Sequence, residues 1–162
     1  MFITQTLRRA VQIKANGTAT IFGERQQTWQ QFQDRVARLA GALKQFNVGP
    51  ADRVAILSLN SDRYLEYLYG VAWAGAACNP VNIRLAPPEI AYTLEDSGSA
   101  VLLVDDAFSQ MLPALRPLLT AVKHLIFIGD GPCPEGCIDY EQLLANSTPV
   151  PDANAGGDDL AG

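Results

Sequence analysis

The sequence predicts an α/β domain with a largely parallel sheet flanked by helices, and two features of its pattern support this class. Short apolar runs bounded by turn residues are typical of buried strands, and they occur at residues 53–59, 77–81, 100–104 and 124–128. Between these runs, apolar residues recur every three or four positions, as on the buried face of a helix. Strand and helix therefore alternate along the chain, which is typical of parallel strands joined by helices.

The first third of the chain predicts helical and hairpin elements before the sheet begins. A short helix and two strands are expected at residues 4–15, 19–22 and 26–29. Thr28 and Gln31 have the spacing of a capping box, which starts the clearest helix of the chain. Gly49-Pro50 cannot continue that helix.

Later helices have recognisable starts and stops. Asn60-Ser61 is expected to cap a second strong helix. Its predicted inward stripe consists of Leu65, Leu68, Tyr69, Ala72, Trp73 and Ala76. A helix from Pro87 is expected to end near Gly98, and a helical stripe at 108–119 must be split by its two prolines. Residues 139–146 predict one more short helix.

Length and composition indicate one globular domain followed by a linker. The chain has 162 residues, of which 48% are hydrophobic and 18% charged. Residues 1–147 are predicted to form the α/β domain, and residues 148–162 have the proline- and glycine-rich composition of a linker. A net charge of -5 without a basic stripe argues against a nucleic-acid partner.

The termini and cysteines favour a cytoplasmic protein. The longest apolar stretch, around Val71–Cys78, is too short to span a bilayer. The first five residues lack the basic start and apolar core of a signal peptide. Three cysteines, an odd number, do not suggest a disulfide framework in a chain of this size.

One glycine-rich turn is a candidate phosphate-binding loop. Gly129-Asp130-Gly131 follows a predicted strand, where backbone N–H groups can converge on an anion. A dinucleotide fingerprint would need a third glycine where Pro134 stands, and the chain has no Gly-Lys-Ser or Gly-Lys-Thr triplet. A surface loop is therefore the favoured interpretation.

The remaining reactive side chains do not form a predicted catalytic or metal site. Cys133 and Cys137 are four residues apart with His124 the single histidine, which does not match the ligand number or spacing of zinc sites. His124 is expected to be structural, and Cys78 a small core residue. The acidic pair Asp105-Asp106 is expected to cap a helix, and Asp158-Asp159 forms no convincing acid/base pair. We therefore expect no catalytic residue and no metal ligand in this chain.

Several segments in order carry a family resemblance. They are Thr28–Phe32, Val48–Ile56, Asn60–Ala76, Asn79–Leu85 and Pro88–Ile90, and the tail Asp158–Ala161 adds a sixth. In this order and with compatible gaps, they resemble the N-terminal region of the adenylate-forming acyl-CoA synthetases, the AMP-binding ligase family. Asn79–Leu85, for example, is similar to the family's Pro-x-Asn-x-Arg-Leu turn. The departures are small: Ala86 stands where Thr or Ser is usual, and Phe32 replaces a Leu.

The resemblance implies a function for a longer parent enzyme. Such enzymes use ATP and Mg²⁺ to convert a carboxylic acid, here expected to be a fatty acid, into an acyl-adenylate, and then transfer the acyl group to coenzyme A. Their phosphate loop follows the Asp-Asp-Leu-Ala lead-in, so this chain is expected to be an inactive N-terminal fragment that binds none of these cofactors itself. Asn82 and Arg84 are carried over as candidate cofactor-binding residues. The favoured alternative is a turn fixed by the Asn beside an exposed Arg.

Two other functions stay open at this point. The chain could be a free-standing α/β module that binds a nucleotide or a protein, or part of an adenylating enzyme outside CoA chemistry. The residues that choose the acid substrate are not expected in this chain. An apolar face left by a missing remainder would favour self-association.

Overall fold

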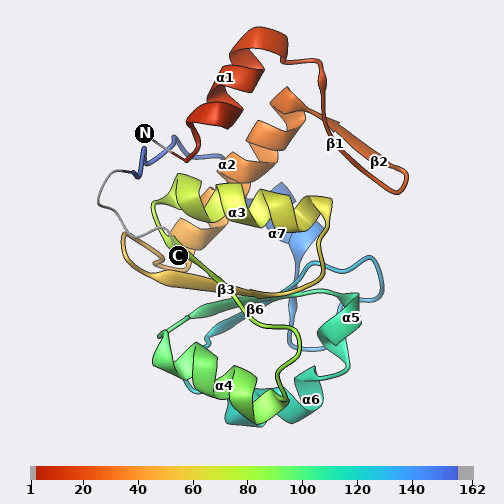
Figure 1. Cartoon of the computed structure of the whole chain (residues 1–162), viewed down its shortest axis with the longest axis vertical. Coiled ribbons are helices and arrows are strands. Elements are labelled where there is room, and N and C mark those ends of the chain that lie inside the picture. The colour runs from red at the N-terminus through yellow and green to blue at the C-terminus, as the bar shows by residue number, and fades with distance from the viewer. Residues whose placement is uncertain (1–2, 157–162) are drawn as a thin grey trace.

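The computed structural model describes residues 3–156 and places a five-stranded parallel sheet between two layers of helices (Figure 1). The strands lie in the order β4–β3–β5–β6–β7, with bounds Ala77–Pro80, Arg53–Leu57, Val101–Val104, His124–Phe127 and Ile138–Asp139. Every neighbouring pair is parallel. The predicted fold class is confirmed.

Helices cover both faces of this sheet. The upper layer in Figure 1 contains α1 (Gln5–Lys14), α2 (Trp29–Gln45), α3 (Asp62–Ala74) and α7 (Tyr140–Asn146). The lower layer contains α4 (Pro87–Asp96), α5 (Asp106–Ser109), α6 (Leu112–Leu115) and the 3₁₀ turn Arg116–Leu118. A separate antiparallel hairpin, β1 (Thr18–Phe22) with β2 (Arg25–Thr28), projects beside α2.

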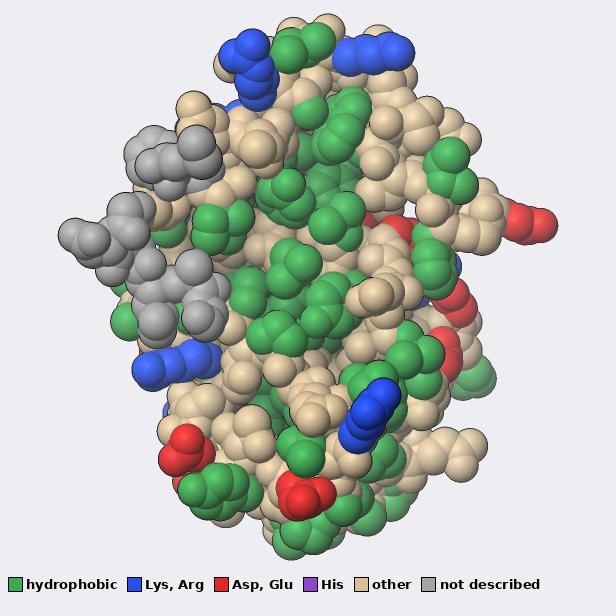
Figure 2. All heavy atoms as spheres, in the orientation of Figure 1, with side chains coloured by type: hydrophobic (Ala, Val, Ile, Leu, Met, Phe, Trp, Pro, Cys, Tyr) green, Lys and Arg blue, Asp and Glu red, His purple; other side chains and the backbone are tan. Residues whose placement is uncertain are grey.

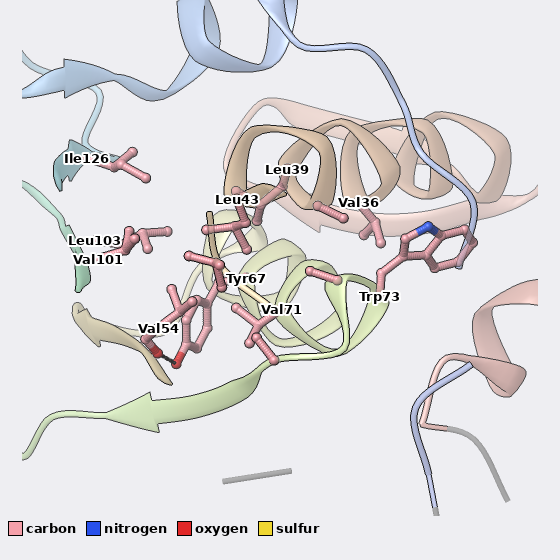
Figure 3. Packing of buried hydrophobic residues seen from close by; sticks show 14 of the residues in the cluster. Val36, Leu39, Leu43, Val54, Tyr67, Val71, Trp73, Val101, Leu103 and Ile126 are labelled. Atoms are coloured by element: carbon pink, nitrogen blue, oxygen red, sulfur yellow. Dashed lines mark hydrogen bonds between the residues drawn. The ribbon is translucent and has the colours of Figure 1, made fainter. Parts of the chain in front are cut away.

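The sheet strands divide their side chains between two hydrophobic cores. Because successive strand residues point to opposite faces, Val54 and Ile56 contact the α2–α3 layer, whereas Ala55 and Leu57 contact the α4–α6 layer. Figure 3 shows the larger core, in which Val36, Leu39 and Leu43 of α2 face Val71 of α3. This alternation explains why the strands read as continuous apolar runs.

Helix α3 is anchored to the sheet by Tyr67. Its side chain is buried, its hydroxyl donates to the Val54 carbonyl at 2.7 Å, and it accepts from the Asn79 N–H at 2.8 Å (Figure 3). Burial raises the pKa of the phenol. Tyr67 thus holds the helix against two neighbouring strands, β3 and β4.

The predicted inward stripe of α3 was wrong at one end. Leu65 is 36% exposed, whereas Asp62, Arg63 and Glu66 are buried. Ala72 and Trp73 are buried as expected. The charged side of the first turns is buried because Asp62, Arg63 and Glu66 meet partners from other elements, and charges with such partners are buried at a lower cost.

Two chain breaks were predicted correctly and one strand was missed. Pro113 and Pro117 each fall in the first turn of a short element, so the expected long helix is split. Gly98 has a φ of 64°, as a helix stop requires. The missed strand is β7, which has two residues and pairs with β6. Such a short element leaves no alternating pattern in the sequence.

Residues 148–156, here called the C-terminal strap, lie against α2 and α3. The Val150 N–H donates to Ala37 O at 3.2 Å, and the Trp73 indole N–H donates to Val150 O at 2.8 Å. Further along, the Asp152 carboxylate accepts from the Thr4 hydroxyl at 2.6 Å. The strap therefore joins the start of the chain to the helices that cover the sheet.

The face shown in Figure 2 carries a group of hydrophobic side chains across its centre. On α3, Leu65 is exposed and Tyr64, Leu68 and Tyr69 are half-buried. Among residues 3–156, no helix has the length and apolar character needed to cross a membrane.

The contact between α2 and the strap gives a stability prediction. A Cβ added at Gly41 would lie 2.1 Å from the Thr148 carbonyl oxygen, a backbone atom that no rotamer change can move. We expect Gly41→Ala to lower the free energy of unfolding by about 1–3 kcal/mol despite its better helix propensity, and to change Trp73 fluorescence as the strap moves. Chemical denaturation measures the first effect.

Gly49→Ala is the matched control. The nearest atom to its added Cβ is Asp52 Oδ2 at 3.8 Å, an ordinary contact. Its effect should stay within about 0.5 kcal/mol. Equal stabilities for the two variants would mean that the strap does not pack against α2 as described.

Candidate functional site at the carboxyl edge of the sheet

The carboxyl ends of three neighbouring strands surround a small hollow. The segments 58–61, 105–107 and 128–130 follow β3, β5 and β6, and they contribute to a hollow of about 240 Å³. Phe22 and Arg25 of the hairpin complete its wall. In open parallel sheets this edge is where ligands usually bind, so its side chains are the first candidates for function.

Asp105 joins the ends of two strands. One carboxylate oxygen accepts from the Ala107 N–H at 3.0 Å, which caps α5 as predicted. The other oxygen accepts from the Leu59 N–H at 2.8 Å and from the Ser58 hydroxyl at 3.0 Å. Asp105 thus joins the segment after β3 to the segment after β5 at the wall of the hollow.

The carboxylate of Asp106 binds the N–H groups of the glycine-rich loop that is the candidate phosphate-binding loop. The carboxylate accepts from the Asp130 N–H at 2.6 Å and from the Gly131 N–H at 3.1 Å. A Cβ at Gly129 would lie 2.5 Å from the same carboxylate, and one at Gly131 would lie 2.6 Å from it. The glycines therefore serve the close approach of an internal anion, and the favoured surface-loop interpretation agrees with this geometry.

Arg63 holds the same loop from the other side. Its guanidinium donates to Ile128 O at 2.8 Å, to Gly129 O at 2.7 Å and to the Asp130 carboxylate at 3.0 Å. The side chain is 9% exposed. A second donor on the guanidinium reaches Glu141 of α7 at 3.0 Å. The loop after β6 is thus fixed between Asp106 and Arg63.

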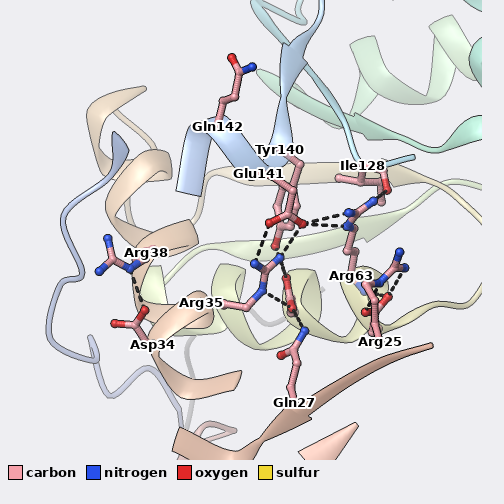
Figure 4. A network of polar contacts seen from close by, with 12 residues as sticks. Arg25, Gln27, Asp34, Arg35, Arg38, Arg63, Ile128, Tyr140, Glu141 and Gln142 are labelled. Carbon is pink, nitrogen blue, oxygen red and sulfur yellow. Dashed lines mark hydrogen bonds and ion pairs between the residues drawn. The ribbon is translucent and has the colours of Figure 1, made fainter. Parts of the chain in front are cut away.

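Glu66 lies at the centre of a buried charge network, and its partners Gln27, Arg35 and Tyr140 are labelled in Figure 4. Its side chain is fully buried, yet both carboxylate oxygens have partners. One accepts from Gln27 and from Arg35, each at 2.7 Å, and the other accepts from the Tyr140 hydroxyl at 2.7 Å and from Arg35 at 3.1 Å. Burial raises the pKa of the Tyr140 phenol, so this group stays a donor.

The network extends to the hairpin through a second ion pair. Arg25 of β2 makes two hydrogen bonds of 2.8 Å to the Asp62 carboxylate, which is 2% exposed. Burial would raise the pKa of Asp62, but the hydrogen bonds and charge of Arg25 outweigh it and lower the pKa. Arg25 also pairs with Asp130 of the β6 loop. The hairpin is therefore tied to the carboxyl edge.

The network borders a polar cavity of about 790 Å³ between the hairpin, α2 and α7. Sequence analysis did not identify its residues as a group. One signal was available: Arg63 and Glu66 are three positions apart in an otherwise apolar helix, so they face the same side. Their partners come from distant parts of the chain and have no sequence pattern in common.

The two carried-over residues lie at the end of β4. The Asn82 side chain accepts from the Arg84 N–H at 3.0 Å, and its carbonyl accepts from the Leu85 N–H at 3.2 Å, so Asn82 fixes a turn. Both Asn82 and Arg84 are exposed. No carboxylate within residues 3–156 lies within ion-pair distance of Arg84. This geometry matches the structural alternative, while a role toward a cofactor stays a prediction.

His124 and Cys78 make packing contacts of a structural kind. His124 stacks on Phe46 with ring centroids 4.0 Å apart. Cys78 is half-buried and packs against the larger core. Within the described range, no group of three or more His, Cys, Asp or Glu side chains could hold a metal ion. Asp158-Asp159 lies outside the described residues.

The described residues that line the hollow do not fit an ATP or Mg²⁺ site. The N–H groups of the glycine-rich loop are already bonded to Asp106. The arginines near the hollow, Arg25 and Arg63, are paired with carboxylates. The bonds made by Asp105, Asp106 and Arg63 hold the ends of β3, β5 and β6 in place next to the hollow.

Comparison with known proteins gives a consistent family match. A family model described as AMP-binding enzyme matches residues 7–162. The acetate/butyrate–CoA ligase AAE7 of Arabidopsis thaliana is 37% identical over 88% of this chain, which spans 28% of that protein. The long-chain-fatty-acid–CoA ligase of Thermus thermophilus is 38% identical over 80% of this chain, with 24% of that protein covered. The chain thus spans about a quarter of these relatives.

Solved structures agree with the sequence relatives. The anthranilate CoA ligase AuaEII in complex with anthranoyl-AMP superposes with a TM-score of 0.89 at 28% identity, covering 98% of this chain and 30% of that one. The N-terminal domain of FACL13 from Mycobacterium tuberculosis superposes with a TM-score of 0.83 at 27% identity, covering 98% and 40%.

The buried carboxylate gives a second stability prediction. In Glu66→Gln an amide replaces the charge that Arg35, Gln27 and Tyr140 bond. We expect the free energy of unfolding to fall by about 2 kcal/mol, because charged hydrogen bonds to a fully buried carboxylate are lost while the half-buried Arg35 keeps Glu141 as its remaining charge partner. The control is Asp34→Asn, which breaks the exposed pair with Arg38 and should change stability by at most about 0.5 kcal/mol. Denaturant titration of both variants decides; a Glu66→Gln effect as small as the control's would contradict the network.

Asp62 gives a prediction for pH dependence. Its pKa is lower in the folded chain than in the unfolded chain, so the unfolded chain binds more protons in acid. The stabilisation is therefore complete above about pH 5 and is lost as the pH falls through the folded pKa, below about pH 4. Unfolding free energies measured at several pH values should decline less steeply in acid for Asp62→Asn than for the wild type.

The stability of the variant should still decline in acid, because Glu141 also titrates. Burial would raise the pKa of Glu141, but Arg35 and Arg63 outweigh it and lower the pKa. Equal acid slopes in the variant and the wild type would show that Asp62 does not stabilise the fold through its charge.

Proposed function

Because the chain belongs to the AMP-binding enzyme family, we propose that it is the N-terminal scaffold of an ATP-dependent acid–CoA ligase. The observation that carries this proposal is the superposition on the anthranilate CoA ligase, which covers 98% of the chain at a TM-score of 0.89 and 28% identity. Relatives named as CoA ligases for acetate or butyrate and for long-chain fatty acids support the same class.

The whole enzyme would activate a carboxylic acid in two steps. The acid carboxylate attacks the α-phosphate of ATP, forming an acyl-adenylate and releasing pyrophosphate. The thiol of coenzyme A then attacks the acyl carbon and displaces AMP. Mg²⁺ would neutralise phosphate charge in the first step.

The contribution of this chain is structural. Its described residues fix the strand ends through Asp105, Asp106 and Arg63, and they contain no fitting ATP site. The strap contacts α2 and α3, and the sequence Asp158–Ala161 after it resembles the lead-in to a phosphate loop. We infer that the nucleotide-binding residues belong to a following part of the enzyme and that this chain supports them without catalysing a step alone.

The substrate is proposed to be a fatty acid. This rests on the names of relatives, which also include ligases for benzoate and indoleacetate. A second candidate function is transfer to a protein carrier instead of coenzyme A. It is supported by the fatty acid–[acyl-carrier-protein] ligase ScoC of Streptomyces coeruleorubidus, which is 36% identical over 71% of this chain.

We propose a cytoplasmic location because Cys78, Cys133 and Cys137 are free thiols. The Arabidopsis relative is named as peroxisomal, so compartments differ among relatives. The apolar side chains exposed on α3 are proposed to contact the remainder of the enzyme or, in the isolated chain, another copy.

The proposed function predicts a difference between this chain and a longer gene product. We expect the chain alone to give no acid-dependent pyrophosphate release from ATP. If the reading frame continues past Gly162, the extended product should release pyrophosphate with a fatty acid and form a thioester when coenzyme A is added. Mass spectrometry of the acyl product separates CoA from carrier-protein transfer.

Two results would contradict this proposal. Acid-dependent pyrophosphate release by the chain alone would show that the site is complete within it. A stop codon directly after Gly162 in the source gene would favour a free-standing binding or scaffold module.

A further inference from the structure

The loop between β6 and β7 carries two cysteines next to an arginine that has no carboxylate partner among the described residues. Cys133 is exposed and Cys137 is half-buried, and both are free thiols. Cys137 packs against the smaller core, between the sheet and the α4–α6 layer. Neither the proposed ligase chemistry nor the fold gives these thiols a role.

The turn between the cysteines brings the Cys133 sulfur to the backbone of Cys137. The Cys137 N–H donates to Pro134 O at 3.0 Å, which closes a tight turn, and Gly136 adopts a φ of 73° within it. The Cys133 sulfur lies 3.6 Å from the Cys137 carbonyl oxygen. One thiol thus already contacts the backbone of the other residue, so joining them needs rotation of the side chains and little movement of the chain.

Arg116 gives one of the two thiols a charged neighbour. Its guanidinium donates to the Cys137 sulfur at 3.1 Å. A Cβ at Gly136 would lie 2.7 Å from the same guanidinium, so the glycine allows the arginine to approach the turn. No carboxylate of residues 3–156 forms an ion pair with Arg116. A positively charged neighbour of this kind is typical of reactive cysteines.

We propose that Cys133 and Cys137 form an oxidisable dithiol that closes to a disulfide with a peroxide as oxidant, with Arg116 as its positioning residue. The Cys137 sulfur attacks the peroxide, the O–O bond breaks, and water and a sulfenic acid form. The Cys133 sulfur then attacks the sulfenic sulfur and displaces a second water. Two thiols lose two electrons and two protons, which reduce one peroxide to two waters, and a small-molecule dithiol reverses the change.

The roles of the two thiols follow from their surroundings. Burial, the neighbouring Cys137 and Asp139 raise the pKa of the Cys133 thiol, while Arg116 acts in the opposite direction. Cys133 is the exposed partner and lacks a direct hydrogen bond from the arginine, so it resolves the sulfenic acid. Closure would fix the loop that leads directly into β7, the edge strand before Tyr140 and Glu141.

Cys78 is an internal control. Its thiol is half-buried on β4 and donates to Leu68 O at 3.8 Å. Burial raises its pKa to about 11, although a hydrogen bond with Tyr67 acts in the opposite direction. The proposal requires this third thiol to stay reduced while the other two react.

The test counts free thiols on the folded chain before and after dilute hydrogen peroxide. We expect three thiols before treatment and one after it, with the loss of two hydrogen atoms in the intact mass and Cys133 linked to Cys137 in the peptide map. Cys78→Ser should lose two thiols in the same way. In Cys133→Ser no disulfide should form, and a dimedone adduct should appear at Cys137.

Arg116 variants test the positioning role. Arg116→Gln should slow disulfide formation about tenfold, as expected from losing one hydrogen bond from a charged donor, and Arg116→Lys should restore part of the rate. Thermal unfolding of each variant checks that the fold persists.

Three outcomes would overturn the proposal: all three thiols persisting in peroxide, a disulfide that includes Cys78 or a second chain, or equal rates for Arg116→Gln and the wild type. The test uses no ligase substrate, so it is independent of the proposed function.

Discussion

The burial of Glu66 is the constraint on which the upper half of this structure depends. A fully buried carboxylate is tolerated only with paired charge and complete hydrogen bonding. Here the partners come from β2, α2 and α7, and α7 lies far from the other two in sequence. Directional bonds to one carboxylate therefore fix how these elements are placed relative to α3, which hydrophobic packing alone specifies less narrowly.

The same helix transmits this order to the carboxyl edge of the sheet. Arg63 lies one turn before Glu66 and bonds the backbone after β6, while Asp106 bonds the same loop from β5. The N–H groups of Asp130 and Gly131 in this loop thus donate to the Asp106 carboxylate. An edge built in this way is rigid and preorganised, which suits a surface that supports a neighbouring active site more than one that binds phosphate itself.

The sequence was sufficient for the fold class because its strands are short apolar runs and its helices have local start and stop signals. The Thr28 capping box and the Asp105 cap depend on residues within a few positions, and both are present. The charge network could not be predicted in the same way. Gln27, Glu66 and Tyr140 are separated by dozens of residues, and the charged residues of α3 are compatible with exposure or burial when only the sequence is known. A stripe of apolar residues alone predicts Leu65 on the inward face of α3, whereas the structure exposes it.

The family match and the geometry constrain different aspects of function. The match concerns the whole enzyme, of which this chain spans about a quarter to a third in the relatives described above. The geometry concerns what these residues can do alone: Asp105, Asp106 and Arg63 bind backbone, and Asn82 fixes its own turn. Asp105, Asp106 and Arg63 are bonded to partners within the chain, so in this geometry they position the strand ends. A role of Asn82 toward a cofactor stays a prediction. An enzyme divided in this way can change its acid substrate in one segment while the scaffold that carries the strand ends stays the same.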